Sequence, residues 1–422
     1  MPILNEREYR RAKARLERLQ ASLQAPSFLE AIRVGFSAEV IELQRSAVQK
    51  RISTLEDAIS QYESLRNRNS FDGESTEIDD LGLLPVFGRI ARGLSQRELA
   101  EALGMKEQQV QRYEAERYAS IKLSTYQRVL SCLGISNHGS LQPNFEFAQT
   151  KAQEQRHIAI SREALSEIAE RGWFPAATTD DLHNEVEEYV HLQNALGPIL
   201  LRLSVRGKKE VDWGALYAWK ARVIDRANDV KSSQKYFDFT DLSWVRELVH
   251  LSVLPGGPLN AAEYLYKRGV VVIIEPHLPK TYLDGAAFLV REQPVIGMTI
   301  RFDRIDNFWF VLLHELGHIF LHHSSGLDDG FFDDMDADAE TALEQQADDF
   351  AYDALIPKEL WKTSPARFAK SVEPMRKFAQ SIGVHEAIVV GRVRRERAYS
   401  AFSEFVGQGE VRRLFSAQAN GA

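Results

Sequence analysis

The stretch FVLLHELGHIFLHH, residues 310–323, constrains this chain most strongly, because it sets several histidines and one acid in an otherwise apolar run. Residues four apart lie on one face of an α-helix, so His314 and His318 can present two imidazole nitrogens to one metal ion. Glu315 is then placed to take a proton from a water at that ion. This H-E-x-x-H arrangement predicts a zinc-dependent hydrolytic site, since buried histidines without partners would be costly.

A catalytic zinc ion needs a third protein ligand. His322 continues the series of histidines, but a rise of about 1.5 Å per residue puts it roughly 12 Å along the axis from His314. Glu344 is the better candidate, because it begins a second helical pattern, LEQQADDFAYDALIP, residues 343–357, that can pack against the first. Asp348, one turn after Glu344, could accept an imidazole N–H and fix the orientation of a ligand histidine.

The segment before the motif predicts a small sheet. Residues 243–269 have the pattern of two helices broken at a Pro-Gly-Gly sequence. Three short β-branched runs bounded by turn residues then predict strands at residues 269–276, 286–290 and 294–300.

Together these features resemble the ImmA/IrrE family of metallopeptidases over about residues 242–358. The likeness rests on the strand-rich lead-in, on HELGHIFLHH, and on E-x-x-A-D-x-F-A running into L-I-P. It implies a zincin-like α+β domain that holds one zinc ion. It also implies the ligands and the general base, which are His314, His318 and Glu344 for the ion and Glu315 for the base.

A second motif lies in RIARGLSQRELAEALGMKEQQVQRYEAER, residues 89–117. Ser95 and Glu98 form a capping box that predicts a helix, and Gly104 permits a tight turn before a second helix from about Glu107 to Glu114. The apolar residues expected to face inward are Leu99, Ala102, Leu103, Val110 and Tyr113. The arrangement predicts a helix-turn-helix.

The exposed face of the second motif helix carries side chains that can reach base edges in a major groove: Gln108, Gln109, Gln111 and Arg112. The surrounding segment, residues 89–128, has eight Lys or Arg against five Asp or Glu, so it is locally basic in a chain of net charge −8. DNA binding is the first interpretation; a helix-turn-helix that makes only protein contacts is the alternative.

Residues 80–135 resemble the phage-repressor-like (XRE) helix-turn-helix family. The resemblance implies that Gln96 contacts the DNA backbone and that Glu107, Gln108 and Arg112 belong to the base-reading helix. Glu107 departs from the pattern, because an acid is repelled by phosphates unless it accepts from a cytosine amino group.

The remaining pattern predicts a mainly α multidomain chain, since 422 residues exceed one compact core. Apolar residues at helical spacing in residues 9–23 and 48–62 predict an N-terminal helical hairpin. It is either a coiled-coil dimerisation arm or a pair of amphipathic helices packed on the body. The expected regions are the hairpin (1–65), a linker (66–80), the helix-turn-helix domain (81–137), a helical middle region (138–240), the metallopeptidase domain (241–358) and a helical C-terminal region (359–422).

Three further features are less informative. In the middle region, Trp213, Tyr217, Trp219 and Phe237 are interpreted as core or interface aromatics. The acid-rich segment 326–340 predicts a solvated loop, because it lacks the glycine and the closing glutamate of a calcium loop. The basic C-terminal helices predict a solvated face, with a DNA-backbone contact as the alternative.

Cysteine content and hydropathy limit the setting of the protein. The one cysteine, Cys132, excludes internal disulfides and zinc sites built on cysteines, and a reducing cytoplasm fits best. No apolar run is long enough for a membrane span.

The two resemblances lead to two functional hypotheses. In the first, the protein is a regulator that binds a double-stranded DNA operator and whose zinc endopeptidase cleaves a repressor, a toxin-antitoxin partner or itself. Family members cleave such regulators in stress, mobile-element and toxin-antitoxin control, and a homodimer is expected. In the second, it is an antitoxin-like repressor whose peptidase fold only senses or docks.

Overall fold

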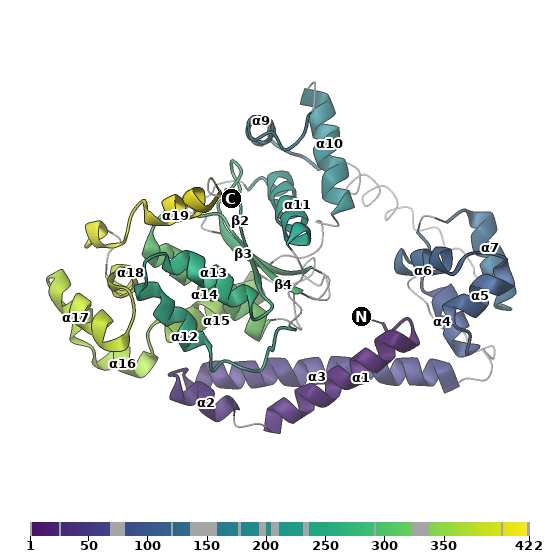
Figure 1. Cartoon of the computed structure of the whole chain (residues 1–422), viewed down its shortest axis with the longest axis horizontal. Helices are drawn as coiled ribbons and strands as arrows, with labels where there is room; N and C mark the ends of the chain where they lie inside the picture. Colours follow the sequence, from purple (N-terminus) through teal and green to yellow (C-terminus); the bar gives the residue numbers. More distant parts are fainter. Residues whose placement is uncertain are drawn as a thin grey trace. The chain divides into compact units, whose positions relative to one another are not determined.

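The computed structural model covers the chain in segments. It describes residues 2–24, 27–67, 81–119, 121–135, 158–175, 179–193, 200–203, 211–230, 236–290, 293–322, 337–397 and 400–419. These residues form two compact units, one of residues 1–24 and 49–145 and the other of residues 25–48 and 146–422. The chain is mainly helical with one small sheet, as predicted (Figure 1). Among the described residues, no helix combines the length and apolar character needed to span a membrane.

The helical hairpin is formed by α1 (Glu6–Gln24) and the second part of α3 (Ala38–Asn67). Tyr9 stacks on Tyr62 with their ring centroids 4.9 Å apart, and Lys13 Nζ lies 2.8 Å from a carboxylate oxygen of Glu63. The helix α3 starts ten residues before the pattern at 48–62, because its first turns face the core of the second unit through Val40 and Ile41. A short helix that the sequence pattern did not predict, α2 (Ser27–Arg33), precedes it.

The helix-turn-helix domain contains four described helices, α4 (Leu84–Ala91), α5 (Gln96–Leu103), α6 (Glu107–Ala115) and α7 (Leu123–Cys132). The capping box at Ser95 is present, and Gly104 ends α5 in the left-handed conformation, with φ 66°. The expectation that Ala102 faces inward is wrong: it is exposed, and Ala100 is buried instead. Both alanines flank the stripe of Leu99 and Leu103, so periodicity alone does not distinguish them.

The hairpin and the helix-turn-helix domain share one hydrophobic core. Hairpin residues of this core are Ile3, Ile59 and Tyr62, and domain residues include Val86, Ile90, Leu99, Val110 and Leu133. Part of the apolar surface of the hairpin therefore packs on the helix-turn-helix domain, as the second interpretation of the hairpin predicts.

A buried arginine joins the parts of this unit. The Arg89 guanidinium donates to both carboxylate oxygens of Glu114, at 2.6 and 2.8 Å. It also donates to the carbonyl oxygens of Leu94, at 2.8 Å, and Leu4, at 2.7 Å. Arg89 and Glu114 are only 4% and 1% exposed, so this ion pair is removed from water.

The second unit contains a four-stranded sheet with the order β1-β3-β4-β2. The strands β2 (Val271–Ile274), β3 (Leu283–Val290) and β4 (Gln293–Met298) are those predicted from the β-branched runs. The strand β1 (Leu200–Leu203), which was not predicted, pairs antiparallel with β3. Strands β3 and β4 are antiparallel, and β2 and β4 are parallel.

Helices cover both faces of the sheet. A Cβ atom added at Gly297 of β4 would lie 2.6 Å from the Trp219 ring of α11 (Trp213–Asp229). A Cβ atom added at Gly285 of β3 would lie 2.6 Å from Val311 of α14 (Ile305–Leu321). These two glycines allow the helices to approach opposite faces of the sheet closely.

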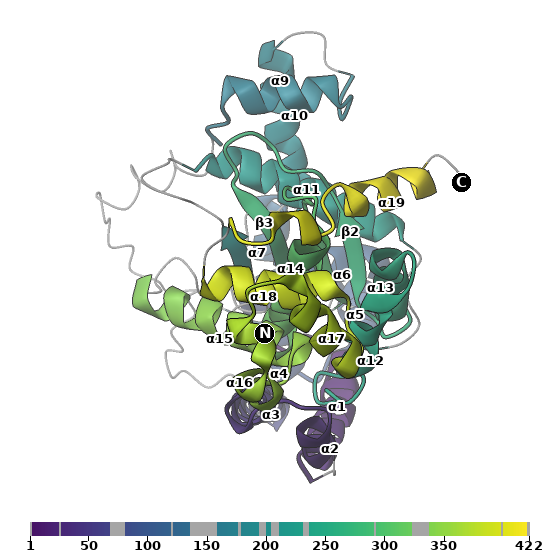
Figure 2. The same ribbon diagram turned by 90° about the vertical axis from the view of Figure 1, so that its left-hand side faces the viewer.

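The helix α14 also packs against α15 (Ala337–Leu355) and α18 (Glu386–Glu396) on its side away from the sheet (Figure 2). This unit also contains α2 and the first part of α3. Its further described helices are α9 (Arg162–Glu170), α10 (Thr179–Leu192), α12 (Val245–His250), η1 (Leu251–Val253), α13 (Gly257–Tyr266), α16 (Lys358–Thr363), η4 (Pro365–Phe368), α17 (Val372–Ile382), η5 (Ser403–Phe405) and α19 (Glu410–Ala419).

Several expectations concern residues outside those described. Most of the linker (68–80), the start of the middle region (138–157) and most of the acid-rich segment (326–336) belong to this group. Of the four aromatics in the middle region, Trp219 is fully buried, whereas Trp213 is 53% exposed.

Replacing Arg89 by methionine should destabilise the first unit by about 3–5 kcal/mol, because the Glu114 carboxylate would stay buried without its main charge partner. The double variant Arg89→Met/Glu114→Leu should recover most of this loss. Hydrogen exchange of the α4–α6 amides in the full chain measures both changes. Equal losses in the single and the double variant would contradict the importance of the ion pair.

Candidate metal centre

The motif histidines lie in α14, a helix of the second unit whose residues are nearly all buried. The side chains of His314, Glu315 and His318 are fully buried, among the apolar residues that make α14 a core helix. Gly317 allows α15 to approach, because a Cβ atom there would lie 3.1 Å from the ring of Phe350. The close packing of these helices brings residues 314–318 and the first part of α15 together.

Three groups that could ligate a metal ion converge between α14 and α15. The Nε2 atoms of His314 and His318 lie 3.1 Å apart. They lie 3.3 and 3.1 Å, respectively, from the two carboxylate oxygens of Glu344. One ligand atom from each residue falls within 4.8 Å of the others, which is compatible with one metal ion. The structure thus brings together the three residues that the sequence suggested as ligands.

The protonation states of this cluster suit a cation. Burial lowers the pKa of His318 to about 4, so its imidazole is neutral at pH 7. Burial would raise the pKa of Glu344, but the adjacent His314 and His318 side chains outweigh it and lower the pKa to about 2. Neutral imidazoles and an ionised carboxylate are the forms that bind metal ions.

Asp348 contacts His314 on the side away from the other ligands. Its Oδ1 atom lies 2.9 Å from His314 Nδ1. A carboxylate oxygen accepts hydrogen bonds, so His314 Nδ1 carries the proton and donates it to Asp348. The lone pair is then on His314 Nε2, which points at His318 and Glu344.

His322 occupies the equivalent position beside His318. His322 Nε2 lies 2.9 Å from Gln346 Oε1, a carbonyl oxygen that accepts its proton. His322 Nδ1 is then an acceptor, and it lies 2.9 Å from His318 Nδ1. His318 therefore donates from Nδ1 and keeps its lone pair on Nε2, toward the cluster.

His322 lies outside the group formed by His314, His318 and Glu344. The sequence did not suggest its contact with His318. Gln346 was also missed. The available signal was the spacing of four residues from His318 to His322, together with a polar residue two positions after Glu344.

The remaining motif residue, Glu315, lies on the side of α14 that faces the sheet. A Cβ atom at Gly285 would lie 2.8 Å from Glu315 Oε1, so glycine at this position of β3 leaves room for the carboxylate. Glu315 is a buried carboxylate one residue after His314, and a carboxylate can accept and return a proton.

The predicted DNA-contacting residues lie on two helices of the first unit. Gln96 is half-buried, and its side-chain amide donates to Glu114 at 2.8 Å, so this amide is held by the buried ion pair. The other predicted residues are exposed on α6: Glu107, Gln108, Gln109, Gln111 and Arg112.

Two of the α6 side chains also stabilise their own helix. Gln109 Oε1 accepts from the backbone N–H of Lys106 at 3.3 Å, and the Gln111 amide donates to Glu107 at 3.0 Å.

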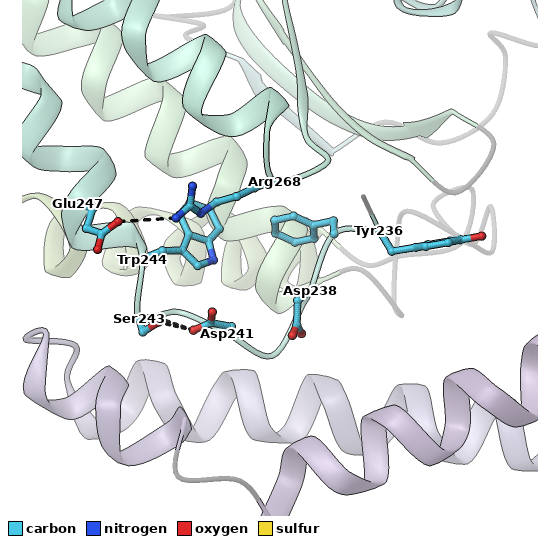
Figure 3. Close-up of a pocket in the computed structure, with 8 residues that line it drawn as sticks. Tyr236, Asp238, Asp241, Ser243, Trp244, Glu247 and Arg268 are labelled. Atoms are coloured by element: carbon cyan, nitrogen blue, oxygen red, sulfur yellow. Dashed lines mark hydrogen bonds and ion pairs between the residues drawn. The ribbon is translucent and has the colours of Figure 1, made fainter. Parts of the chain in front are cut away.

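A separate pocket of about 300 Å³ is lined by residues from 236 to 268 (Figure 3). Arg268 lies over the Trp244 ring, 5.1 Å from its centroid, and 3.6 Å from a carboxylate oxygen of Glu247. Ser243 Oγ donates to Asp241 at 2.5 Å. The lining includes none of the predicted site residues.

Comparisons with known proteins agree with both motifs. Residues 88–136 match the family model described as Helix-turn-helix, and residues 267–394 match the peptidase family described as the IrrE N-terminal-like domain. No curated protein and no solved structure gives a significant match to the chain. Both resemblances drawn from the motifs are confirmed, in the expected order along the chain. The chain thus carries a helix-turn-helix domain followed by a domain similar to the IrrE N-terminal-like peptidase domain.

Proposed function

We propose that this protein is a DNA-binding regulator whose peptidase domain is a zinc-dependent endopeptidase. The observation that supports this most directly is the buried convergence of His314, His318 and Glu344, with Glu315 between the two histidines in the sequence. The match to a peptidase family over the same helices supports it independently.

The donor set fits zinc. Two imidazole nitrogens and one carboxylate are the protein ligands of many catalytic zinc sites, which keep a further position open for water or substrate. The proposed ligands are His314, His318 and Glu344, oriented by Asp348 and His322. When bound, zinc would polarise the scissile carbonyl and lower the pKa of the attacking water.

Glu315 acts as the general base in this proposal. Its carboxylate accepts a proton from the water whose oxygen attacks the peptide carbonyl carbon. As the C–N bond breaks, the same carboxyl group returns the proton to the leaving amine. Glu315 is buried beside β3, one residue after the proposed ligand His314.

The proposed substrate is a regulatory protein, either a repressor, a toxin-antitoxin partner or this chain itself. A helix-turn-helix in the same chain would bring the peptidase to such proteins at an operator in the cytoplasm. Stress, mobile-element or toxin-antitoxin control is the proposed context, with a homodimer as the acting form. The alternative is an antitoxin-like repressor whose peptidase fold only senses or docks.

Glu315→Gln should retain zinc and DNA binding but slow peptide cleavage by about 10²–10⁴-fold, because the amide cannot take the proton. Asp349→Asn, on the exposed side of α15, is the matched control and should cleave normally. Mass spectrometry of candidate regulators after incubation measures cleavage. Equal cleavage by Glu315→Gln and wild type would refute the assigned base, and zinc-loaded wild type that cleaves nothing would favour the docking alternative.

His322→Ala should weaken zinc binding by about 10–100-fold, because His318 would lose the group that fixes its ring and tautomer. The exposed His191 provides the control, and His191→Ala should leave zinc affinity unchanged. Competition with a chromophoric chelator measures both. Unchanged affinity in His322→Ala would show that the contact does not orient the ligand.

If Arg112 hydrogen-bonds to a base edge, Arg112→Ala should weaken operator binding by about 1–3 kcal/mol. If Arg112 contacts a phosphate, the same change should instead reduce the slope of log affinity against log salt concentration by about one. Lys377→Ala, on an exposed face of α17, should change neither quantity. Fluorescence anisotropy with labelled DNA over a salt series measures both. DNA affinity that does not fall as salt rises would contradict DNA binding by this domain.

A further inference from the structure

We propose that Arg395 is a positioning residue of the metal centre, which acts on His314 through Asp348. This inference rests on the proposed zinc function. It adds a residue that contacts the carboxylate beside His314. Arg395 lies on α18 and is one residue beyond the segment that matches the peptidase family, so neither the motifs nor the match indicated it.

The three residues form a continuous chain of contacts. Arg395 Nη2 donates to Asp348 Oδ2 at 2.5 Å. The other oxygen of the same carboxylate, Asp348 Oδ1, accepts from His314 Nδ1 at 2.9 Å. The carboxylate is thus held at one oxygen by the guanidinium and holds the proposed ligand with the other.

Aromatic rings fix the position of the guanidinium. Its Cζ atom lies 5.2 Å from the ring centroid of Phe310 and 4.9 Å from that of Tyr352. Phe310 is one turn before His314 on α14, and Tyr352 is one turn after Asp348 on α15. The two helices that carry the metal centre therefore also place the arginine, through cation–π contacts.

This arrangement matters because an aspartate carboxylate rotates easily about its terminal torsion. A strong charge-assisted hydrogen bond at Oδ2 restricts that rotation and keeps Oδ1 directed at His314. The His314 ring is then held with Nε2 toward His318 and Glu344 before a metal ion binds. Such preorganisation reduces the ordering that metal binding would otherwise require.

An ion pair between two exposed side chains contributes little to stability. The pair of Arg395 and Asp348 is different, because Arg395 is 36% exposed whereas Asp348 is only 13% exposed. The inference therefore concerns metal affinity and ligand geometry more than folding.

The same helix offers a matched control. Arg392 lies 3.7 Å from the Tyr352 ring centroid, so it has similar aromatic packing. Its ion pair at 3.0 Å is with Glu396 on its own helix, not with the metal centre. Removing Arg392 tests the effect of losing an arginine from this surface.

The experiment measures zinc affinity of the full chain by chelator competition. Arg395→Ala should bind zinc about 3- to 10-fold more weakly, a smaller effect than the roughly 10–100-fold expected when a group that touches the ligand is removed. Arg395→Lys should restore part of the loss, because lysine keeps the positive charge but lacks the planar guanidinium fork. Arg392→Ala should remain within about twofold of wild type.

A double-mutant cycle tests whether Arg395 acts through Asp348. In the Asp348→Ala background, Arg395→Ala should cause no further loss of zinc affinity. The visible spectrum of the cobalt(II)-loaded protein provides a second measurement, which should change in Arg395→Ala and not in Arg392→Ala. This spectrum reports ligand geometry and would not respond to a merely structural loss.

Wild-type affinity and an unchanged cobalt spectrum in Arg395→Ala would overturn the inference, as would full additivity in the double variant. If Arg395→Ala lowers the melting temperature of the metal-free protein, Arg395→Gln keeps part of the apolar stem but is too short to reach Asp348 as Nη2 does, and the same spectral comparison applies. Wild type that binds neither zinc nor cobalt would refute the proposed function itself, an outcome distinct from failure of the arginine alone.

Discussion

The packing of α14 against α15 is the constraint on which the rest of the candidate site depends. The absence of a side chain at Gly317 lets Phe350 approach, and this contact sets Glu344 opposite His314 and His318. Neither helix alone supplies three convergent donors. The strands β3 and β4 and the helix α18 also contact α14, so the candidate site lies within a packed core.

Features with a local physical cause were predictable from the sequence. The spacing of the motif histidines on one helical face, the β-branched runs of β2, β3 and β4, and the capping box at Ser95 all depend on residues close in the chain. Features set by distant partners were missed. The strand β1 is defined by its register with β3, and the Arg395 contact depends on how α18 meets α15. Periodicity could not choose between Ala100 and Ala102, because only packing does.

The two candidate ligands on α14 are oriented by different chemistry. His314 donates to a carboxylate that an arginine holds, whereas His318 donates to a second histidine that a glutamine amide holds. Both arrangements leave Nε2 as the donor atom toward the cluster. The two histidines are buried, their hydrogen bonds fix the tautomer of each ring, and both Nε2 atoms point toward the cluster. This agreement is the physical reason to interpret the helix pair as a metal centre and not as a core that happens to contain histidines.

The central claim is that these residues hold a metal ion, and metal content tests it most directly. Protein purified without chelators or a metal-affinity tag should contain about one zinc ion per chain, by elemental analysis. His318→Ala and Glu344→Ala should each lose it, because either change removes one donor of the three. No bound metal in the wild type, with no uptake of added zinc, would contradict the account and leave the chain as a DNA-binding regulator with a peptidase-like fold.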